Sequence, residues 1–171
     1  MIADQTADIM TEEMDEMVQG AVAEVFSVML NMPIEHEPTG TLDTPIECSV
    51  ASSVGFLGKI NGVIYLYFEG KLAENVCGGL LGMTEDELDP EMVNDTLGEI
   101  SNMVVGQIKS CLCDRGLECR LTIPSILRGS GLKVDGTSDT KRRLISFKSG
   151  DQQMVVEVLV KSEDNNEQTE S

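Results

Sequence analysis

The chain has 171 residues, of which 41% are hydrophobic and 25% charged, and its formal net charge is −18. This length and composition are typical of a soluble globular protein, most often a single domain. The acidic balance excludes a nucleic-acid-binding protein, because phosphate contacts need clustered lysine and arginine, and it argues against binding to an anionic membrane. No apolar run approaches the roughly 20 residues that span a bilayer, and no signal peptide is evident, so we expect a cytoplasmic protein.

The cysteines and the single histidine do not form a pattern typical of a metal site. An odd number of cysteines without a signal peptide indicates reduced thiols. The "CLC" stretch is not a C-x-x-C motif, and His36 stands far from it in the sequence. We therefore expect no zinc site and no cofactor belonging to this chain. The five cysteines are Cys48, Cys77, Cys111, Cys113 and Cys119.

In chain order, the first predicted element is a helix from Thr11, its N-cap, to about Met32. Pro33 and residues 35–45 then form a predicted loop. The apolar positions that recur at intervals of three and four, and so define the predicted core side of the helix, are Met14, Met17, Val18, Ala21, Val25, Val28 and Met29.

Two strands follow in segments 46–56 and 58–70, joined by a hairpin turn at Leu57–Gly58, because both segments are rich in β-branched or aromatic residues. A short helix in segment 71–82 then ends at glycine. A long helix is predicted from about Pro90 to Asp114, with Asp89 as its cap and Gly116 closing it.

The C-terminal part contains three strand-like runs, 118–129, 142–150 and 152–161. Pro124 in the first run suggests a sheet edge or a bulge, because proline cannot donate to a ladder. The element order predicts an α+β fold, a mostly antiparallel sheet with two long helices packed on one side. The predicted organisation is an acidic lead at 1–10, one domain at 11–161 and a disordered acidic tail at 162–171.

The long helix separates an apolar side from a polar one when it is drawn as a helical wheel. Asp95, Glu99, Asn102 and Gly106 fall within roughly 60° of one another, opposite the apolar side. A solvated face is the simplest explanation of such a pattern. However, glycine at 98 and 106 and asparagine at 102 are unfavourable in a helix interior. The apolar side consists of Met92, Val93, Leu97, Ile100, Val104, Ile108 and Cys111, with Met103 at its margin.

The polar side suits a docking face, because Gly106 lets another surface approach the backbone closely. A carboxamide such as that of Asn102 both donates and accepts hydrogen bonds, so it can orient an attacking water. A carboxylate such as that of Glu99 can pair with a cation on a partner. Together the two groups would complete a hydrolytic site to which the partner contributes most of the groups, as water-positioning glutamines do in GTP hydrolysis.

On the long helix, Asp95, Glu99 and Asn102 have the spacing D-xxx-E-xx-N. The connection "MTEDELDPE" precedes them, and "AEVFSVML" ends the first helix. This combination resembles the CheC/CheX/FliY chemotaxis phosphatases, and CheX most closely. The resemblance implies a phosphatase acting on the phospho-aspartate of a CheY-like receiver domain. Glu99 would pair with the receiver's active-site lysine and Asn102 would orient the hydrolytic water. Mg²⁺ would belong to the receiver. Asp95, Gly98 and Gly106 would support the helix or the docking surface.

The same resemblance implies a homodimer and bears on the first helix. Aligning "EMVQGAVAEVF" with "EISNMVVGQIK" places Glu16 on Glu99 and Gln19 on Asn102, and we interpret Glu16 and Gln19 as a vestigial second site. Two alternatives to a phosphatase remain open. One is a non-catalytic adaptor that docks receivers or flagellar-switch components. The other is a sensor that binds a small ligand in the methionine-rich core.

Overall fold

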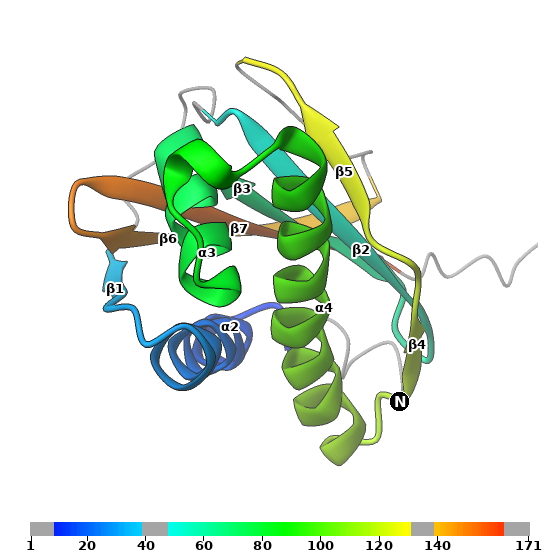
Figure 1. Cartoon of the computed structure of the whole chain (residues 1–171). Coiled ribbons are helices and arrows are strands. Elements are labelled where there is room, and N and C mark those ends of the chain that lie inside the picture. The colour runs from blue at the N-terminus through cyan, green and yellow to red at the C-terminus, as the bar shows by residue number, and fades with distance from the viewer. Residues whose placement is uncertain (1–8, 39–47, 131–138, 163–171) are drawn as a thin grey trace, which may run out of the picture.

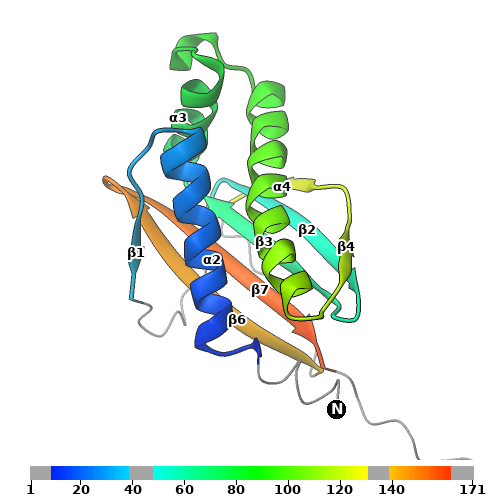
Figure 2. The same cartoon turned by 90° about the horizontal axis from the view of Figure 1, so that it is seen from below.

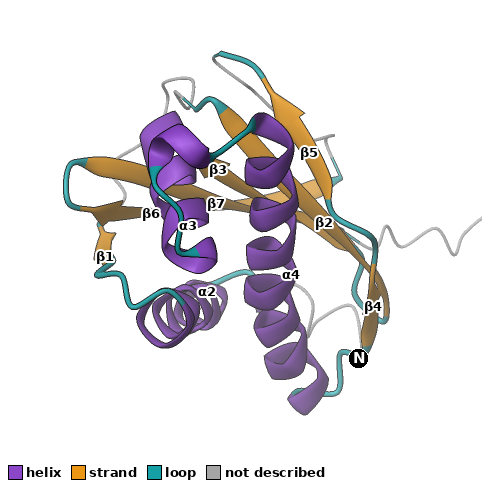
Figure 3. Ribbon diagram, in the orientation of Figure 1, coloured by secondary structure: helices purple, strands orange, loops and turns teal. Residues whose placement is uncertain are grey.

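The computed structural model describes residues 9–38, 48–130 and 139–162, and these residues form an α+β fold. Three α-helices lie together on one face of a seven-stranded sheet (Figures 2 and 3). The predicted fold class is therefore confirmed. The helical elements are α2 (Glu12–Glu24), the π-helix η1 (Val25–Met29), α3 (Gly70–Leu81), the 3₁₀-helix η2 (Glu85–Glu87) and α4 (Pro90–Asp114). The strands are β1 (Glu35–Glu37), β2 (Val50–Gly58), β3 (Gly62–Phe68), β4 (Cys119–Leu121), β5 (Ser125–Arg128), β6 (Thr140–Ser149) and β7 (Gln152–Lys161).

The sheet has the order β1-β6-β7-β3-β2-β4, and β5 also pairs with β2 (Figure 1). All of these pairings are antiparallel. The hairpin between β2 and β3 turns later than predicted, because β2 continues through Gly58. The Gly58 N–H then donates to Asn61 Oδ1 at 3.0 Å and closes the turn.

Two strand predictions need correction. Residues 35–37, predicted as loop, form β1, which pairs with β6 at the edge of the sheet. The run 118–129 is not one strand. It is divided around Pro124 into β4 and β5, which pair with opposite ends of β2. The predicted edge position of this run is confirmed, since β2 is the only strand with which β4 and β5 pair in the described ranges.

The first helix departs from the predicted periodicity at its end. In the π-helix η1, the Leu30 N–H donates to the Val25 carbonyl, five residues back, at 3.2 Å. A π turn is wider than an α turn, so the side chains after it are rotated. Leu30 is buried, whereas Val28 and Met29 are 71% and 51% exposed. The prediction that Val28 and Met29 belong to the core side is therefore wrong.

The main core lies between the sheet and the helices, and α4 contributes more to it than predicted. Leu97, Ile100, Val104 and Ile108 are fully buried there. Met92, Met103 and Cys111 pack against this core but are only partly buried. Additional buried residues on α4 that lie beyond the predicted apolar side are Thr96, Ser101, Val105 and Leu112.

The opposite face of the sheet contains an unexpected buried carboxylate. Val156 and Val158 of β7 enter the main core, so Glu157 between them points the other way. Glu157 is 0% exposed, accepts a hydrogen bond from the Tyr67 hydroxyl at 2.8 Å and forms an ion pair with Arg142. Burial, and then the hydrogen bond to Glu157, raise the pKa of Tyr67 far above its usual value.

The described ranges bear only partly on the predicted division of the chain. Ile9 and Met10, within the predicted lead, are buried against the main core. Residues 163–171 of the predicted tail, and the segments 39–47 and 131–138, lie outside the described ranges. The division into lead, domain and tail stays a prediction.

Candidate functional site

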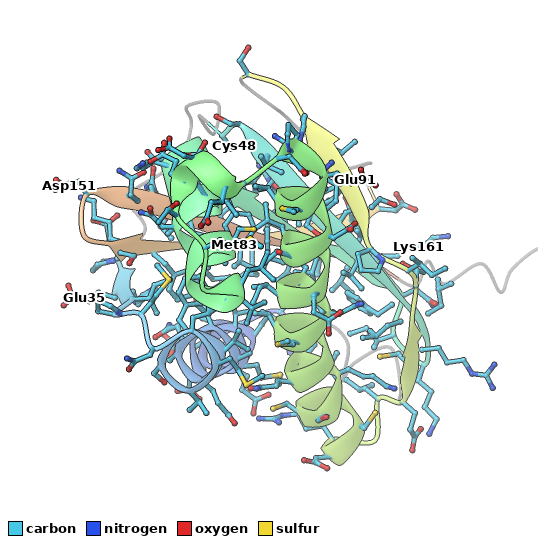
Figure 4. All side chains as sticks on the ribbon, in the orientation of Figure 1. Glu35, Cys48, Met83, Glu91, Asp151 and Lys161 are labelled. Carbon is cyan, nitrogen blue, oxygen red and sulfur yellow. The ribbon has the colours of Figure 1, made fainter. Side chains whose placement is uncertain are left out.

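The α4 helix carries the candidate site, and short-range signals define both of its ends. The Met92 N–H donates to Asp89 Oδ1 at 2.9 Å, so Asp89 is the N-cap, as predicted, and Pro90 occupies the first turn. Beyond Asp114, Gly116 adopts φ +79°, a conformation that favours glycine. The predicted span of 90–114 is confirmed. Glu91, labelled in Figure 4, marks the first turn, at the end of α4 that approaches β5.

The outward side of α4 displays the predicted polar residues. Asp95 and Glu99 are exposed, and Asn102 and Gly106 are half-buried. Among the described residues, none of the side chains of Asp95, Glu99 and Asn102 has a hydrogen bond or ion pair. Side chains three and four positions apart on a helix are neighbours, so Glu99 and Asn102 stand side by side with their polar groups available to a partner.

Another asparagine on the same helix shows the contrast. Asn94 Oδ1 accepts a hydrogen bond from Arg128 Nε at 2.7 Å, and the Arg128 guanidinium also donates to the Pro90 carbonyl at 3.0 Å. Asn94 thus ties β5 to the start of α4, whereas Asn102, two turns further along, is not used for internal structure. Sequence reasoning missed this role of Asn94 and Arg128, which no local pattern indicates.

The two glycines of this face have different surroundings. A Cβ placed on Gly98 would lie 3.8 Å from Pro124 Cβ, an ordinary contact distance, so the β4–β5 connection runs directly beside this point of the helix. A Cβ placed on Gly106 would meet no atom within 4 Å. Internal packing therefore does not require glycine at 106, and the open space beside it is available to another molecule.

The first helix presents a similar pair of residues. On α2, Glu16 is exposed and Gln19 is half-buried, the same burial classes as Glu99 and Asn102. The two helices pack against each other and cross at an angle, and Arg115, just after α4, pairs with Glu13 near the start of α2 at 3.6 Å (Figures 1 and 2). Glu16 and Gln19 thus lie on α2, a different helix from the one that carries Glu99 and Asn102.

Other kinds of site find little support in the described ranges. No cluster of three or more potential metal-ligating side chains occurs there, and all five cysteines, which lie in these ranges, are thiols rather than disulfides. A pocket of about 310 Å³ lies near the start of α4, lined by Glu74, Glu85, Asp89 and Arg128 among others, but by no methionine. In the part of the chain that the structure describes, no helix has the length and apolar character needed to cross a bilayer.

The fold of this chain is similar to the folds of chemotaxis proteins of known structure. The crystal structure of chemotaxis protein CheX from Vibrio vulnificus matches with a TM-score of 0.77 at 21% identity, covering 87% of this chain and 97% of that one. A chain of the CheX–CheY–BeF₃–Mg²⁺ complex from Borrelia burgdorferi matches with a TM-score of 0.74 at 24% identity, covering 85% and 96%. These likenesses define the fold.

Sequence comparison identifies the family. The family model for the chemotaxis phosphatase CheX matches residues 50–148, a span that includes all of α4. The CheY-P phosphatase CheX of Thermotoga maritima is 27% identical over 117 residues, which cover 67% of this chain and 75% of that protein. The chain belongs to the CheX family of chemotaxis phosphatases, and the resemblance noted from the sequence is confirmed.

Proposed function

We propose that this protein dephosphorylates the phospho-aspartate of a CheY-like receiver domain, using Glu99 and Asn102. The observation that carries the proposal is the pair itself: a carboxylate and a carboxamide one helical turn apart, exposed or half-buried, and without partners among the described residues. Membership of the CheX family supports the same activity. We expect the protein to act in the cytoplasm.

The chemistry needs only a positioned water molecule, because an acyl phosphate is already activated. Asn102 would accept a hydrogen bond from the water and hold it in line with the phosphorus atom. The water oxygen then bonds to phosphorus, the bond from phosphorus to the aspartate oxygen breaks, and inorganic phosphate and the free carboxylate are released. Glu99 would pair with the receiver's lysine and fix the geometry. The Mg²⁺ would be the receiver's own, and the named complex of the Borrelia relative contains Mg²⁺ together with CheX, CheY and BeF₃.

The rigidity of α4 supports this assignment. Asn102 lies near the middle of a 25-residue helix whose inner side is packed into the core and whose start is capped by Asp89. A side chain on such an element is held closely in place, which positioning of a water molecule requires.

The test is the rate of phosphate loss from a phosphorylated CheY-like receiver, with and without this protein. We expect the wild type to speed the loss, Asn102→Ala to abolish the effect, and Glu99→Ala to weaken both docking and rate. Asn75→Ala, at an exposed asparagine of α3, is the matched control and should behave as wild type. If Asn102→Ala is as active as wild type, the mechanism is wrong.

A non-catalytic adaptor is the second candidate, because an exposed Glu–Asn pair would also serve docking. The same experiment separates the two functions when receiver binding is measured in parallel. An adaptor would bind the phosphorylated receiver without changing the lifetime of its phosphate.

The remaining proposals concern the second helix pair and the assembly. We expect Gln19→Ala to leave the activity unchanged, since Glu16 and Gln19 represent a vestigial site. We also propose a homodimer, with an exposed edge of the sheet as the candidate contact surface. Light scattering coupled to size exclusion would measure the mass in solution, and a monomeric mass would refute the dimer.

A further inference from the structure

The connection between β4 and β5, residues 122–124, presents an apolar side chain to solvent beside the candidate site. Ile123 is 88% exposed, the highest value among the exposed large apolar residues of the described chain. A single exposed apolar residue is ordinary on a protein surface and needs a reason only when its place is unusual. The place of Ile123 is unusual in two respects, its rigidity and its position along α4.

The 122–124 connection is held firmly on both sides. The Gly55 N–H of β2 donates to Thr122 Oγ1 at 2.8 Å, and the Thr122 N–H donates to the Gly55 carbonyl at 2.9 Å. On the other side Pro124 lies against Gly98 of α4. Ile123 is thus displayed from a fixed backbone, and its exposure is not the result of a loosely held loop.

The connection leads along α4 towards Asn102. Asn94, Gly98 and Asn102 follow at steps of four, so they form one stripe on the helix. Arg128 of β5 contacts the first of these residues and Pro124 lies against the second. The chain from β4 to β5 therefore runs antiparallel to α4, with β5 near its start and β4 near its end (Figure 1). Ile123 comes just before Pro124 in this direction of the chain, so it lies further along α4 than Pro124, towards Asn102.

The position of Ile123 beside Asn102 indicates which molecule binds to it. A molecule that receives Asn102 into its active site must also cover the surface next to it, where Ile123 stands. A second copy of this chain seated on Ile123 would instead obstruct Asn102. The net charge of −18 also bears on how the receiver binds. Because a phosphorylated receiver pocket is acidic too, the electrostatic interaction between the two proteins is either weakly attractive or repulsive. Apolar contact supplies the attraction that charge does not.

We propose that Ile123 is the apolar anchor of the receiver-docking surface, an inference that rests on the proposed function. The receiver would present an apolar patch adjoining its phosphorylation pocket. Glu99 and Asn102 would enter the pocket while Ile123 binds the patch beside it. Ile123 takes no part in the chemistry and determines how tightly the receiver binds.

The test compares Ile123→Ser with Val28→Ser, a matched apolar position that is 71% exposed on η1. Both variants should keep the thermal midpoint of the wild type, because both side chains are solvated. With phosphorylated receiver at increasing concentration, Ile123→Ser should raise the half-saturating concentration about tenfold, the loss typical of an interface anchor, and leave the maximal rate unchanged. Ile123→Leu should restore most of the affinity, and Val28→Ser should match wild type.

Binding to the beryllofluoride-loaded receiver, measured for wild type and Ile123→Ser, separates failure of this inference from failure of the proposed function. If the wild type binds without speeding phosphate loss, the phosphatase proposal fails, and the tenfold weaker binding of Ile123→Ser would still support the anchor. An unchanged half-saturation and binding constant for Ile123→Ser would overturn the anchor. The anchor would also be overturned if the only defect of Ile123→Ser were loss of a homodimer. It would be overturned as well if the wild type did not bind the receiver at all.

Discussion

Replacing Gly106 by alanine should stabilise the protein and impair its function at the same time. Gly106 lies inside α4, and a Cβ added there meets no atom within 4 Å. Alanine is favoured over glycine in a helix interior by about 1 kcal/mol, so the free energy of unfolding should rise by about that amount. In a domain of this size, that gain corresponds to an increase of about 2–4 °C in Tm. The added methyl group would occupy the space that we assign to the receiver.

The measurements are thermal unfolding and the rate of phosphate loss as a function of receiver concentration. We expect the half-saturating concentration for Gly106→Ala to rise about tenfold, because forcing a methyl group into a packed contact costs about 1–3 kcal/mol. Gly20→Ala on α2 is the control, since a Cβ there also meets no atom within 4 Å, and it should gain similar stability with unchanged activity. If Gly106→Ala keeps full activity, the idea that its open space receives the partner is wrong. If it loses stability, the packing argument is wrong.

Four further predictions concern stability and charge. Asp89→Ala should lower the free energy of unfolding by about 1 kcal/mol through loss of the α4 cap, measured by urea denaturation against the exposed control Asp86→Ala. Tyr67→Phe should cost about 1–3 kcal/mol, because it leaves one oxygen of buried Glu157 without its donor, whereas Tyr65→Phe, which removes no such bond, should cost less. Burial and Glu157 raise the pKa of both tyrosines above the usual 10.0, so the unfolded chain loses its phenolic protons at lower pH than the native protein does. The free energy of unfolding should therefore be constant with respect to these groups below pH 10 and decline above it. In a pH titration, the phenolate absorbance of the native protein should rise at higher pH than that of the unfolded protein. Moderate salt should improve association with the acidic receiver by screening repulsion, and a fall in activity with rising salt would contradict this expectation.

The candidate site was predictable because its signals are local. A cap, a proline in the first turn and a closing glycine define α4 within a few residues of its ends, and the period of the helix then places Glu99 and Asn102 on its outward side. None of these inferences needs information about distant parts of the chain. The same holds for the short helix α3, which ends at Gly82 with φ +65°.

The features that were missed depend on contacts between distant segments. β1 exists because Glu35–Glu37 pair with β6, more than 100 residues later, and three residues carry too little pattern to predict a strand. The place of Ile123 beside α4 follows from the pairing of β4 and β5 with β2, which the sequence of 118–129 does not reveal. Glu157, in an alternating strand, would be expected to face solvent, whereas Tyr67 and Arg142 accompany it in a buried position.

The π turn at the end of α2 also has a consequence for chain length. The hydrogen bond from Leu30 to Val25 spans one residue more than an α-helical bond, and the extra length is taken up by exposed residues such as Val28 and Met29. Removal of one of these exposed residues would turn the same bond into an ordinary i to i−4 bond and leave Val25 and Leu30 in the core. The helix end is thus a point where the chain can lose a single residue without disturbing the packing on either side. In an alignment of related chains, insertions or deletions of one residue should occur at this turn.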